Sequence, residues 1–428
     1  MKKSLAIAGL AIVHAVAAAA PGPDESFSQL AARYLDEVSV HSPVAATALG
    51  DHRADSRLDE VDSAARERIR KAFGEYRETL AAIKRSDLSR ANQVDAAILH
   101  NKIESTLFEL DTLEEWAWNP LYYVRLSGNA IYGLLSRDFA PLEERLDNAA
   151  SRLEQLPRFF AQARDSLQPE RVPKIHAETA IQQNRGLVTI MDSMIVPQLQ
   201  ALPPDTAKRL EEAMTSAREA IAKQQAWLEE ELLPRANGDF RIGAELYDRK
   251  LAFALNSPLS RKEIRARAEQ EYENVRNQMY EVAKTIYAKK HPMTSFPDQP
   301  DEAYKQVIIR AGLEEAYQAL PPRDGIVDVA KQQLQEAIDF VIEHDIVEMS
   351  EEPVEIIVMP EFQRGVALAY LDPPGPLDRD QPAFYAVAPL PEDWTEEQVE
   401  SFLREYNLYS IQDLTIHEAV PGHYLQLA

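Results

Sequence analysis

His417-Glu418-Ala419-Val420-Pro421-Gly422-His423 is the stretch of this 428-residue chain that decides which fold and site to expect. Zinc hydrolases often use two histidines with a glutamate beside the first, because neutral imidazoles bind the metal and the carboxylate takes a proton from water. In the common form the second histidine lies four residues after the first, which puts both rings on one face of a helix. Here the step is six residues, about 600° of helical rotation, so an unbroken helix would point the rings apart.

Pro421 and Gly422 lie between the two histidines and predict a break in that helix. Proline cannot donate to the carbonyl of His417 and its ring crowds that carbonyl, while glycine adopts backbone angles that other residues avoid. A break there would bring the ring of His423 back beside that of His417. We therefore predict His417 and His423 as zinc ligands and Glu418 as the general base. In the alternative interpretation, Pro421 and Gly422 simply end one helix and His423 opens the next segment.

The sequence IHEAVPGHYLQLA, from Ile416 to the last residue, resembles the signature of a large bacterial family, the domain of unknown function 885 family. The resemblance runs from about Ser26 to Ala428, and includes RIGAELYDRKLAF from Arg241, VMPEFQRGVALAYLDPPGPLD from Val358 and FYAVAPLP from Phe384. It implies a zinc metallopeptidase of the helical zincin type, with zinc as cofactor and a peptide as substrate.

The same resemblance implies a further glutamate ligand downstream of the motif. Only five residues follow His423, so we expect the chain to be the front part of a longer protein, incomplete at its C-terminus. On that expectation, residues 1–428 lack the third protein ligand of a catalytic zinc site and are inactive by themselves.

The N-terminus has the pattern of a secretory signal peptide over residues 1–20. Lys2 and Lys3 form the charged region, and an apolar core from Leu5 to Ala20 ends in an alanine run suited to cleavage. Sixteen residues interrupted by His14 are short for a membrane span, and no other stretch is long and apolar enough for one. We expect a periplasmic or extracellular protein without a membrane anchor; a disordered or anchoring tail is the alternative.

Charge and cysteine content exclude several classes of site and partner. A formal net charge of −24 repels phosphates, so neither nucleic acid nor anionic lipid is an expected partner. The chain has no cysteine, which excludes disulfides, cysteine-ligated metals, a catalytic cysteine and a lipid anchor on an N-terminal cysteine. Any metal must therefore rest on histidines and carboxylates.

Residues 24–238 read as an N-terminal helical region. Apolar residues recur at three- and four-residue steps between Pro or Gly breaks, in the runs Phe27 to Val38, Ala64 to Ile83, Ala91 to Trp116, Leu142 to Ala163, His176 to Met194 and Asp205 to Leu233. Aromatic residues gather around Asn119-Pro120 and either pack in the core or line a cleft, namely Trp116, Trp118, Tyr122, Tyr123 and Tyr132.

Residues 239–428 read as the front part of a zincin-like catalytic region. A capping box at Ser260 and Glu263 predicts a long helix, whose stripe of apolar residues from Ile264 to Ile286 we expect to be buried. Short β-rich segments at Val354 to Met359, Val366 to Leu371 and Phe384 to Ala388 predict a small sheet. The expected fold is thus mainly α with a small β-sheet next to the catalytic helix, an α+β class of helical zincin-like architecture.

The last helices complete the expected site. A capping box at Thr395 and Gln398 starts one helix, and a second, from about Leu408 to Val420, ends in the motif. Tyr370 and Tyr385 are candidate donors to a developing oxyanion, with a packed strand position as the alternative for each. Asp413 is a candidate partner for the free N–H of His417, or a solvated surface residue. His344 reads as a helix-end residue.

The preferred function is a secreted zinc-dependent metallopeptidase in which Glu418 activates the water that attacks a peptide carbonyl. One alternative is a non-catalytic helical binding protein on the same scaffold. The other is a zinc hydrolase acting on a non-peptide amide or ester. Nothing in the sequence fixes substrate specificity or oligomeric state.

Overall fold

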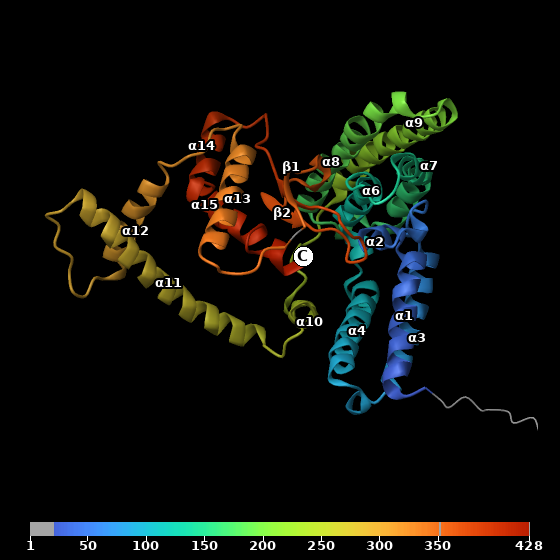
Figure 1. Ribbon diagram of the computed structural model, residues 1–428, viewed down its shortest axis with the longest axis horizontal. Coiled ribbons are helices and arrows are strands. Elements are labelled where there is room, and N and C mark those ends of the chain that lie inside the picture. The colour runs from blue at the N-terminus through green and yellow to red at the C-terminus, as the bar shows by residue number, and fades with distance from the viewer. Residues whose placement is uncertain (1–20, 351, 428) are drawn as a thin grey trace, which may run out of the picture.

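The computed structural model describes residues 21–350 and 352–427, so the predicted signal peptide lies outside the described residues. The expected fold class is confirmed, because helices dominate and a three-stranded sheet precedes the motif (Figure 1). The helices are α1 (Pro23–His41), α2 (Pro43–Ala48), α3 (Ser63–Ala81), α4 (Arg90–Phe108), α5 (Glu115–Trp118), α6 (Pro120–Leu135), α7 (Leu142–Ser166), α8 (Lys174–Ile190), α9 (Pro204–Trp227), α10 (Ala244–Leu255), α11 (Arg261–Lys290), α12 (Glu302–Ala316), α13 (Ile326–Glu343), α14 (Glu396–Glu405), α15 (Leu408–Glu418) and α16 (His423–Leu427).

The largest core lies among α6, α7, α8 and α9. Large side chains on facing helices fill it, including Tyr123, Phe159, Phe160 and Ile195. The periodic apolar runs predicted α7, α8 and α9, but α6 lies outside those runs. Two glycines lower its intrinsic helix propensity, and burial against neighbouring helices supplies the stability instead. Gly128 of α6 is needed for this packing, since a Cβ there would overlap the ring of Phe362.

A second core joins α1, α3 and α4 below the bundle in Figure 1. Phe27, Tyr76 and Ile103 are buried at its centre. The predicted helix Ala91 to Trp116 begins as expected but departs from regular α geometry after Phe108. There a π-helical turn, η3 (Glu109–Leu113), leads into α5. This turn separates the aromatic residues around Asn119 from the straight part of α4.

The sheet has the strand order β1-β3-β2, formed by β1 (Val354–Val358), β2 (Ala369–Asp372) and β3 (Ala383–Val387). β1 runs parallel to β3 and β2 antiparallel to it, with Leu371 opposite Tyr385 and Tyr370 opposite Ala386. Because side chains alternate along a strand, Leu371 and Tyr385 share the face that packs on α13 and α15. Tyr370 lies on the opposite face, with Met359 and Ala386.

The loop between β2 and β3 packs against the segment that follows α2. The backbone N–H of Leu377 donates to the carbonyl of Leu49 over 3.0 Å. His52 lies between two carboxylates, with Nδ1 2.8 Å from Asp55 and Nε2 3.0 Å from Asp378. These contacts join segments more than 300 residues apart in the sequence and hold β2 in place.

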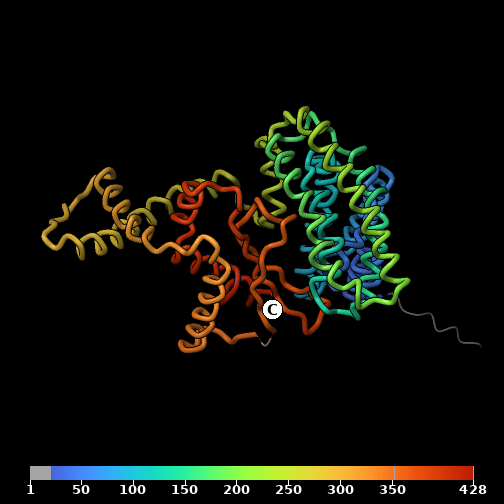
Figure 2. Tube along the Cα trace, turned by 90° about the horizontal axis from the view of Figure 1, so that it is seen from above, coloured from blue at the N-terminus to red at the C-terminus, as the bar shows by residue number. Residues whose placement is uncertain are grey.

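The helices α11 and α12 form an arm that projects away from the rest of the chain (Figures 1 and 2). The predicted capping box is present at Ser260 and Glu263, and the helix starts at Arg261 as expected. The expectation of a buried apolar stripe is wrong for most of its length. Tyr272 is 58% exposed and Val282 is 62% exposed, because α12 covers only the adjacent strip around Tyr280 and Ala283.

Candidate functional site

The motif begins with the last two residues of α15 and continues beyond the C-terminal end of that helix. Asn407 caps the start of this helix by accepting from the N–H groups of Tyr409 and Ser410. The helix ends at Glu418, two residues before the predicted Val420, because Ala419 turns to φ −108° and ψ −98°. Ala419 and Val420 are fully buried in the core beneath the sheet, so the chain leaves the helix inward.

Gly422 brings the chain back against the helix it has just left. A Cβ at this position would overlap the carbonyl oxygen of His417 and stand 2.5 Å from that of Ile416. The next helix, α16, starts at His423 and is anchored by the buried Tyr424, whose hydroxyl donates to the carbonyl of Glu352. The peptide between Val420 and Pro421 is cis. Glycine is thus the residue that this close backbone approach requires.

The fold-back places the two histidine rings side by side. Their centroids lie 4.8 Å apart at an interplanar angle of 87°. Nδ1 of His423 lies 3.0 Å from the amide oxygen of Gln426, which orients the ring and leaves its Nε2 for another partner. His417 is exposed and His423 half-buried, so both rings are reachable from solvent. The expected break near Pro421 and Gly422 is present, and it brings together two rings that a regular helix would point apart.

The carboxylate of Glu418 lies against β2. The backbone N–H of Leu371 donates to it over 3.2 Å. Leu371 is opposite Tyr385 in the ladder, and its N–H points away from β3 toward the outer edge of the sheet. The glutamate beside the first histidine is therefore fixed at the edge of a strand.

Tyr385 lies beneath α15, with no exposed surface. Its hydroxyl is 3.3 Å from Oγ1 of Thr415, whose own hydrogen is donated to the carbonyl of Ile411 over 2.8 Å. Since a hydroxyl has one hydrogen, the tyrosine is the donor in this pair. Burial raises the pKa of Tyr385 to about 12; the bond to Thr415 opposes the shift and the charge of Glu418 adds to it. The phenol stays neutral and ties the central strand to the helix of the motif.

Tyr370 is on the other face of the sheet. Its hydroxyl donates to the amide oxygen of Gln363, beside the 3-10 turn η9 (Glu361–Gln363). Burial raises its pKa, and the nearby charge of Asp372 adds to that. The strand register therefore separates Tyr370 from Glu418 and the two imidazoles, and the arrangement gives no support to a role for it in their chemistry.

Two further residues singled out by the sequence, Asp413 and His344, take no part in the contacts that the structure describes for the imidazole pair. Asp413 is exposed, and no hydrogen bond joins it to His417 in the part of the chain that the structure describes. His344 caps the end of α13, with Nδ1 3.0 Å from the carbonyl of Phe340, which confirms it as a helix-end residue.

The donor set fits a zinc ion in part. Two neighbouring imidazoles match the nitrogen donors that zinc prefers, but a catalytic zinc site uses three protein ligands. Within residues 21–350 and 352–427, no group of three histidine, aspartate or glutamate side chains comes close enough to share one metal. The described residues would thus supply two of the three donors of such a site.

Sequence reasoning missed the partners of the motif. The backbone N–H of Leu371 and the hydroxyl of Thr415 hold Glu418 and Tyr385, and neither residue type signals such a role. The β-rich composition of Val366 to Leu371 predicted a strand, but nothing in it specified which helix would lie at the edge of that strand.

The chain is similar to a protein of known structure. A structure described as that of "a putative lipoprotein of unknown function" from Shewanella oneidensis superimposes with a TM-score of 0.69 at 27% sequence identity. The match covers 94% of this chain and 71% of the other. No curated protein matches.

The family comparison covers nearly all of the described chain. Residues 43–428 match the family described as "Bacterial protein of unknown function (DUF885)", which includes the helical bundle, the arm, the sheet and the motif. A match over this much of the sequence shows membership, and the chain therefore belongs to that family.

Proposed function

We propose that this protein is a zinc-dependent hydrolase of peptide bonds, with His417 and His423 as metal ligands and Glu418 as the general base. One observation carries the proposal: the two imidazoles lie with centroids 4.8 Å apart, next to a glutamate whose carboxylate is held at the outer edge of β2. A base and a metal-binding pair side by side at the edge of a sheet suit attack by water on an extended peptide.

Each residue of the proposed site has its own role in the reaction. We expect an extended peptide to run along the outer edge of β2, where Glu418 holds the N–H of Leu371, so that a carbonyl of the substrate would lie beside Glu418. Glu418 takes a proton from the attacking water and delivers it to the leaving amine. Tyr385 positions α15 through Thr415. Zinc, when bound, supplies a Lewis acid that polarises the carbonyl. Zincin-like architecture is part of this proposal.

We further propose that the protein acts outside the cytoplasm. The similar structure is described as that of "a putative lipoprotein", and residues 1–20 carry the charged and apolar pattern of a secretory signal. Among the residues described, no helix has the length and apolar character to cross a membrane. Recovery of the processed protein from the periplasm or medium supports this, and recovery of intact Met1 in the cytoplasm contradicts it.

A non-catalytic binding protein is the second candidate, favoured by the count of two donors among the described residues. A third is a hydrolase of non-peptide amides or esters that uses the same residues.

Zinc titration by calorimetry tests the metal site without reference to activity. The wild-type protein should bind one equivalent, and His417→Ala or His423→Ala should weaken the affinity at least about 10-fold. His344→Ala is the matched control, since that histidine caps α13. Equal affinity in all four proteins would remove the metal site from the proposal.

Turnover separates the three candidates. Chelator-sensitive cleavage of a peptide library that Glu418→Gln abolishes supports the peptidase. Hydrolysis of ester substrates alone supports the third candidate. Zinc binding without turnover of either substrate class supports the binding protein.

A further inference from the structure

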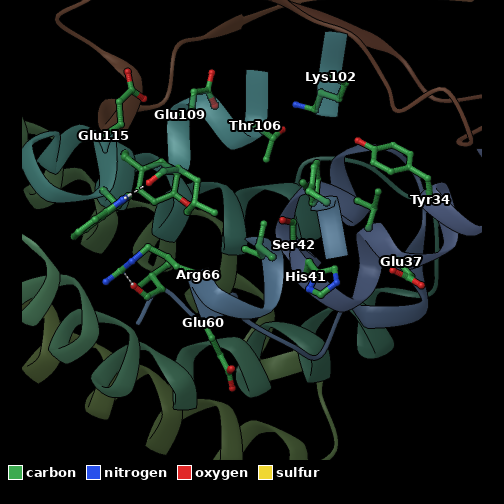
Figure 3. Close-up of a pocket in the computed structure, with 18 of the residues that line it drawn as sticks. Tyr34, Glu37, His41, Ser42, Glu60, Arg66, Lys102, Thr106, Glu109 and Glu115 are labelled. Carbon is green, nitrogen blue, oxygen red and sulfur yellow. Dashed lines mark hydrogen bonds between the residues drawn. The ribbon is translucent and has the colours of Figure 1, made fainter. Parts of the chain in front are cut away.

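A cavity of about 680 Å³ lies in the N-terminal half, apart from the motif (Figure 3). All of its lining residues fall between 34 and 123, whereas the proposed metal site uses residues 371–423. The lining residues come from α1, α2, the segment before α3, α3, the end of α4, η3, α5 and α6. Cavities of this size hold most of a small organic ligand in known proteins. The proposed hydrolase does not use this space.

Aromatic rings line much of the cavity. Tyr34 packs edge-to-face on Phe73 at 5.9 Å and on Tyr76 at 5.5 Å. Trp116 contributes to the opposite side, with the guanidinium of Arg66 stacked on its ring at 3.9 Å. The sequence left open whether the aromatic residues near Asn119 pack in the core or line a cleft. Trp116, Tyr122 and Tyr123 line this cavity, and such walls favour the apolar body of a ligand.

One end of the cavity carries two adjacent carboxylates. Figure 3 shows Glu109 and Glu115 together on one side, with Lys102 farther along. Glu115 pairs with Lys250 at 3.0 Å, whereas Glu109 forms no ion pair within 4.0 Å among residues 21–350 and 352–427. Burial raises the pKa of Glu109, and the charge of Glu115 raises it further against the opposing effects of Lys102 and Lys250. A ligand cation beside Glu109 would stabilise a carboxylate that has no ion-pair partner among the described residues.

Lys250 is paired with Glu115 at this end, so Glu109 is the carboxylate left for a ligand cation among the described residues. Lys102 precedes Glu109 by seven residues, about 10 Å along the axis of a helix. The guanidinium of Arg66 is engaged by Trp116 and by the carbonyl of Val61 at 2.7 Å. Burial lowers the pKa of His41, a lining residue, and so disfavours its charged form.

We propose that this cavity binds an apolar ligand carrying an ammonium group, with the apolar body among the aromatic rings and the ammonium at Glu109. A hydrophobic peptide with a free N-terminus and an aliphatic amine both have this chemistry.

Calorimetric titration of the full protein with octylamine, 1-octanol and octanoate tests the charge preference. Octylamine should bind tighter than the other two. Glu109→Gln should weaken octylamine at least about 10-fold, as loss of a charge-assisted contact does, and leave 1-octanol within about twofold. Glu104→Gln, on α4 but outside the lining, is the matched control. Octanoate binding as tightly as octylamine, or an equal loss of octylamine and octanol in Glu109→Gln, would overturn the proposal.

Two further measurements distinguish a peptide ligand from an aliphatic amine and control for misfolding of the Glu109 variant. The tripeptide Phe-Leu-Phe amide is compared with its N-acetyl form. If only the form with the free amine binds, and binds tighter than octylamine, the ligand is identified as a peptide. Binding of octylamine alone identifies the aliphatic amine, and binding of neither overturns the site. Tyr34→Ala should weaken octylamine and 1-octanol together, because it removes apolar wall and leaves the carboxylates in place.

Discussion

At the scale of single residues, Gly422 decides whether the two histidines meet. We expect Gly422→Ala to push the fold-back away from the carbonyl of His417, which the new Cβ would overlap. The free energy of unfolding should fall by about 1–3 kcal/mol, as for other overpacked sites, and zinc affinity should fall at least about 10-fold. Denaturant unfolding and calorimetry measure the two effects.

Gly74→Ala provides the control. Gly74 lies inside α3, where a Cβ would meet no heavy atom beyond its own helix within 4 Å, so alanine there should stabilise the protein by about 0.4–1 kcal/mol. If both substitutions behave alike, the close approach at Gly422 does not hold the motif in shape.

Tyr385 is the second residue whose role can be separated by substitution. Tyr385→Phe removes the hydroxyl that donates to Thr415 and should cost about 0.5–1.5 kcal/mol of stability. A positioning role predicts that the kcat of a peptide substrate stays within about 10-fold of the wild type. A loss of about 100-fold or more would instead identify Tyr385 as an oxyanion donor.

At the scale of elements, His52 links the segment after α2 to the loop between β2 and β3. Burial lowers the pKa of His52, but hydrogen bonds to Asp55 and Asp378 outweigh burial and raise it above 6.5. A histidine whose folded pKa is raised contributes stability that is fully present below pH 6.5 and is lost as pH rises through the folded value. Asp51 is a further acidic neighbour, and the ring stacks on Phe139 at 3.6 Å.

We therefore expect the free energy of unfolding to fall as pH rises above 6.5, and His52→Gln to remove much of that slope. Denaturant melts at several pH values measure it. His344→Gln is the control, since its ring contacts only the end of its own helix, at Phe340. Parallel pH profiles for the wild type and His52→Gln would contradict the link.

At the scale of the whole molecule, the arm of α11 and α12 lies outside the main cores (Figure 1). Val282 is 62% exposed, so Val282→Ser should change stability by less than about 0.5 kcal/mol. Ile308, 3% exposed between the two helices of the arm, should cost about 2–5 kcal/mol when changed to alanine. Thermal unfolding of both variants checks this, and a large loss in Val282→Ser would show that the stripe on α11 is covered in solution.

The sequence by itself determined the features that depend on residues close together along the chain. Apolar spacing predicted α3, α7 and α11, and the capping boxes at Ser260 and Thr395 located two helix starts, because caps are hydrogen bonds within a few residues. Proline and glycine in the motif likewise predicted the break after α15.

Only the tertiary structure decided which faces are covered and which distant groups meet. The apolar stripe of α11 has the same spacing whether or not another element packs on it. Tyr370 and Tyr385 both read as strand residues, and the register of β2 on β3 put them on opposite faces. The hydrogen bond from Leu371 to Glu418 joins residues 47 positions apart, and the one between His52 and Asp378 joins residues 326 positions apart. No local sequence pattern encodes such pairs, because they depend on how whole elements pack.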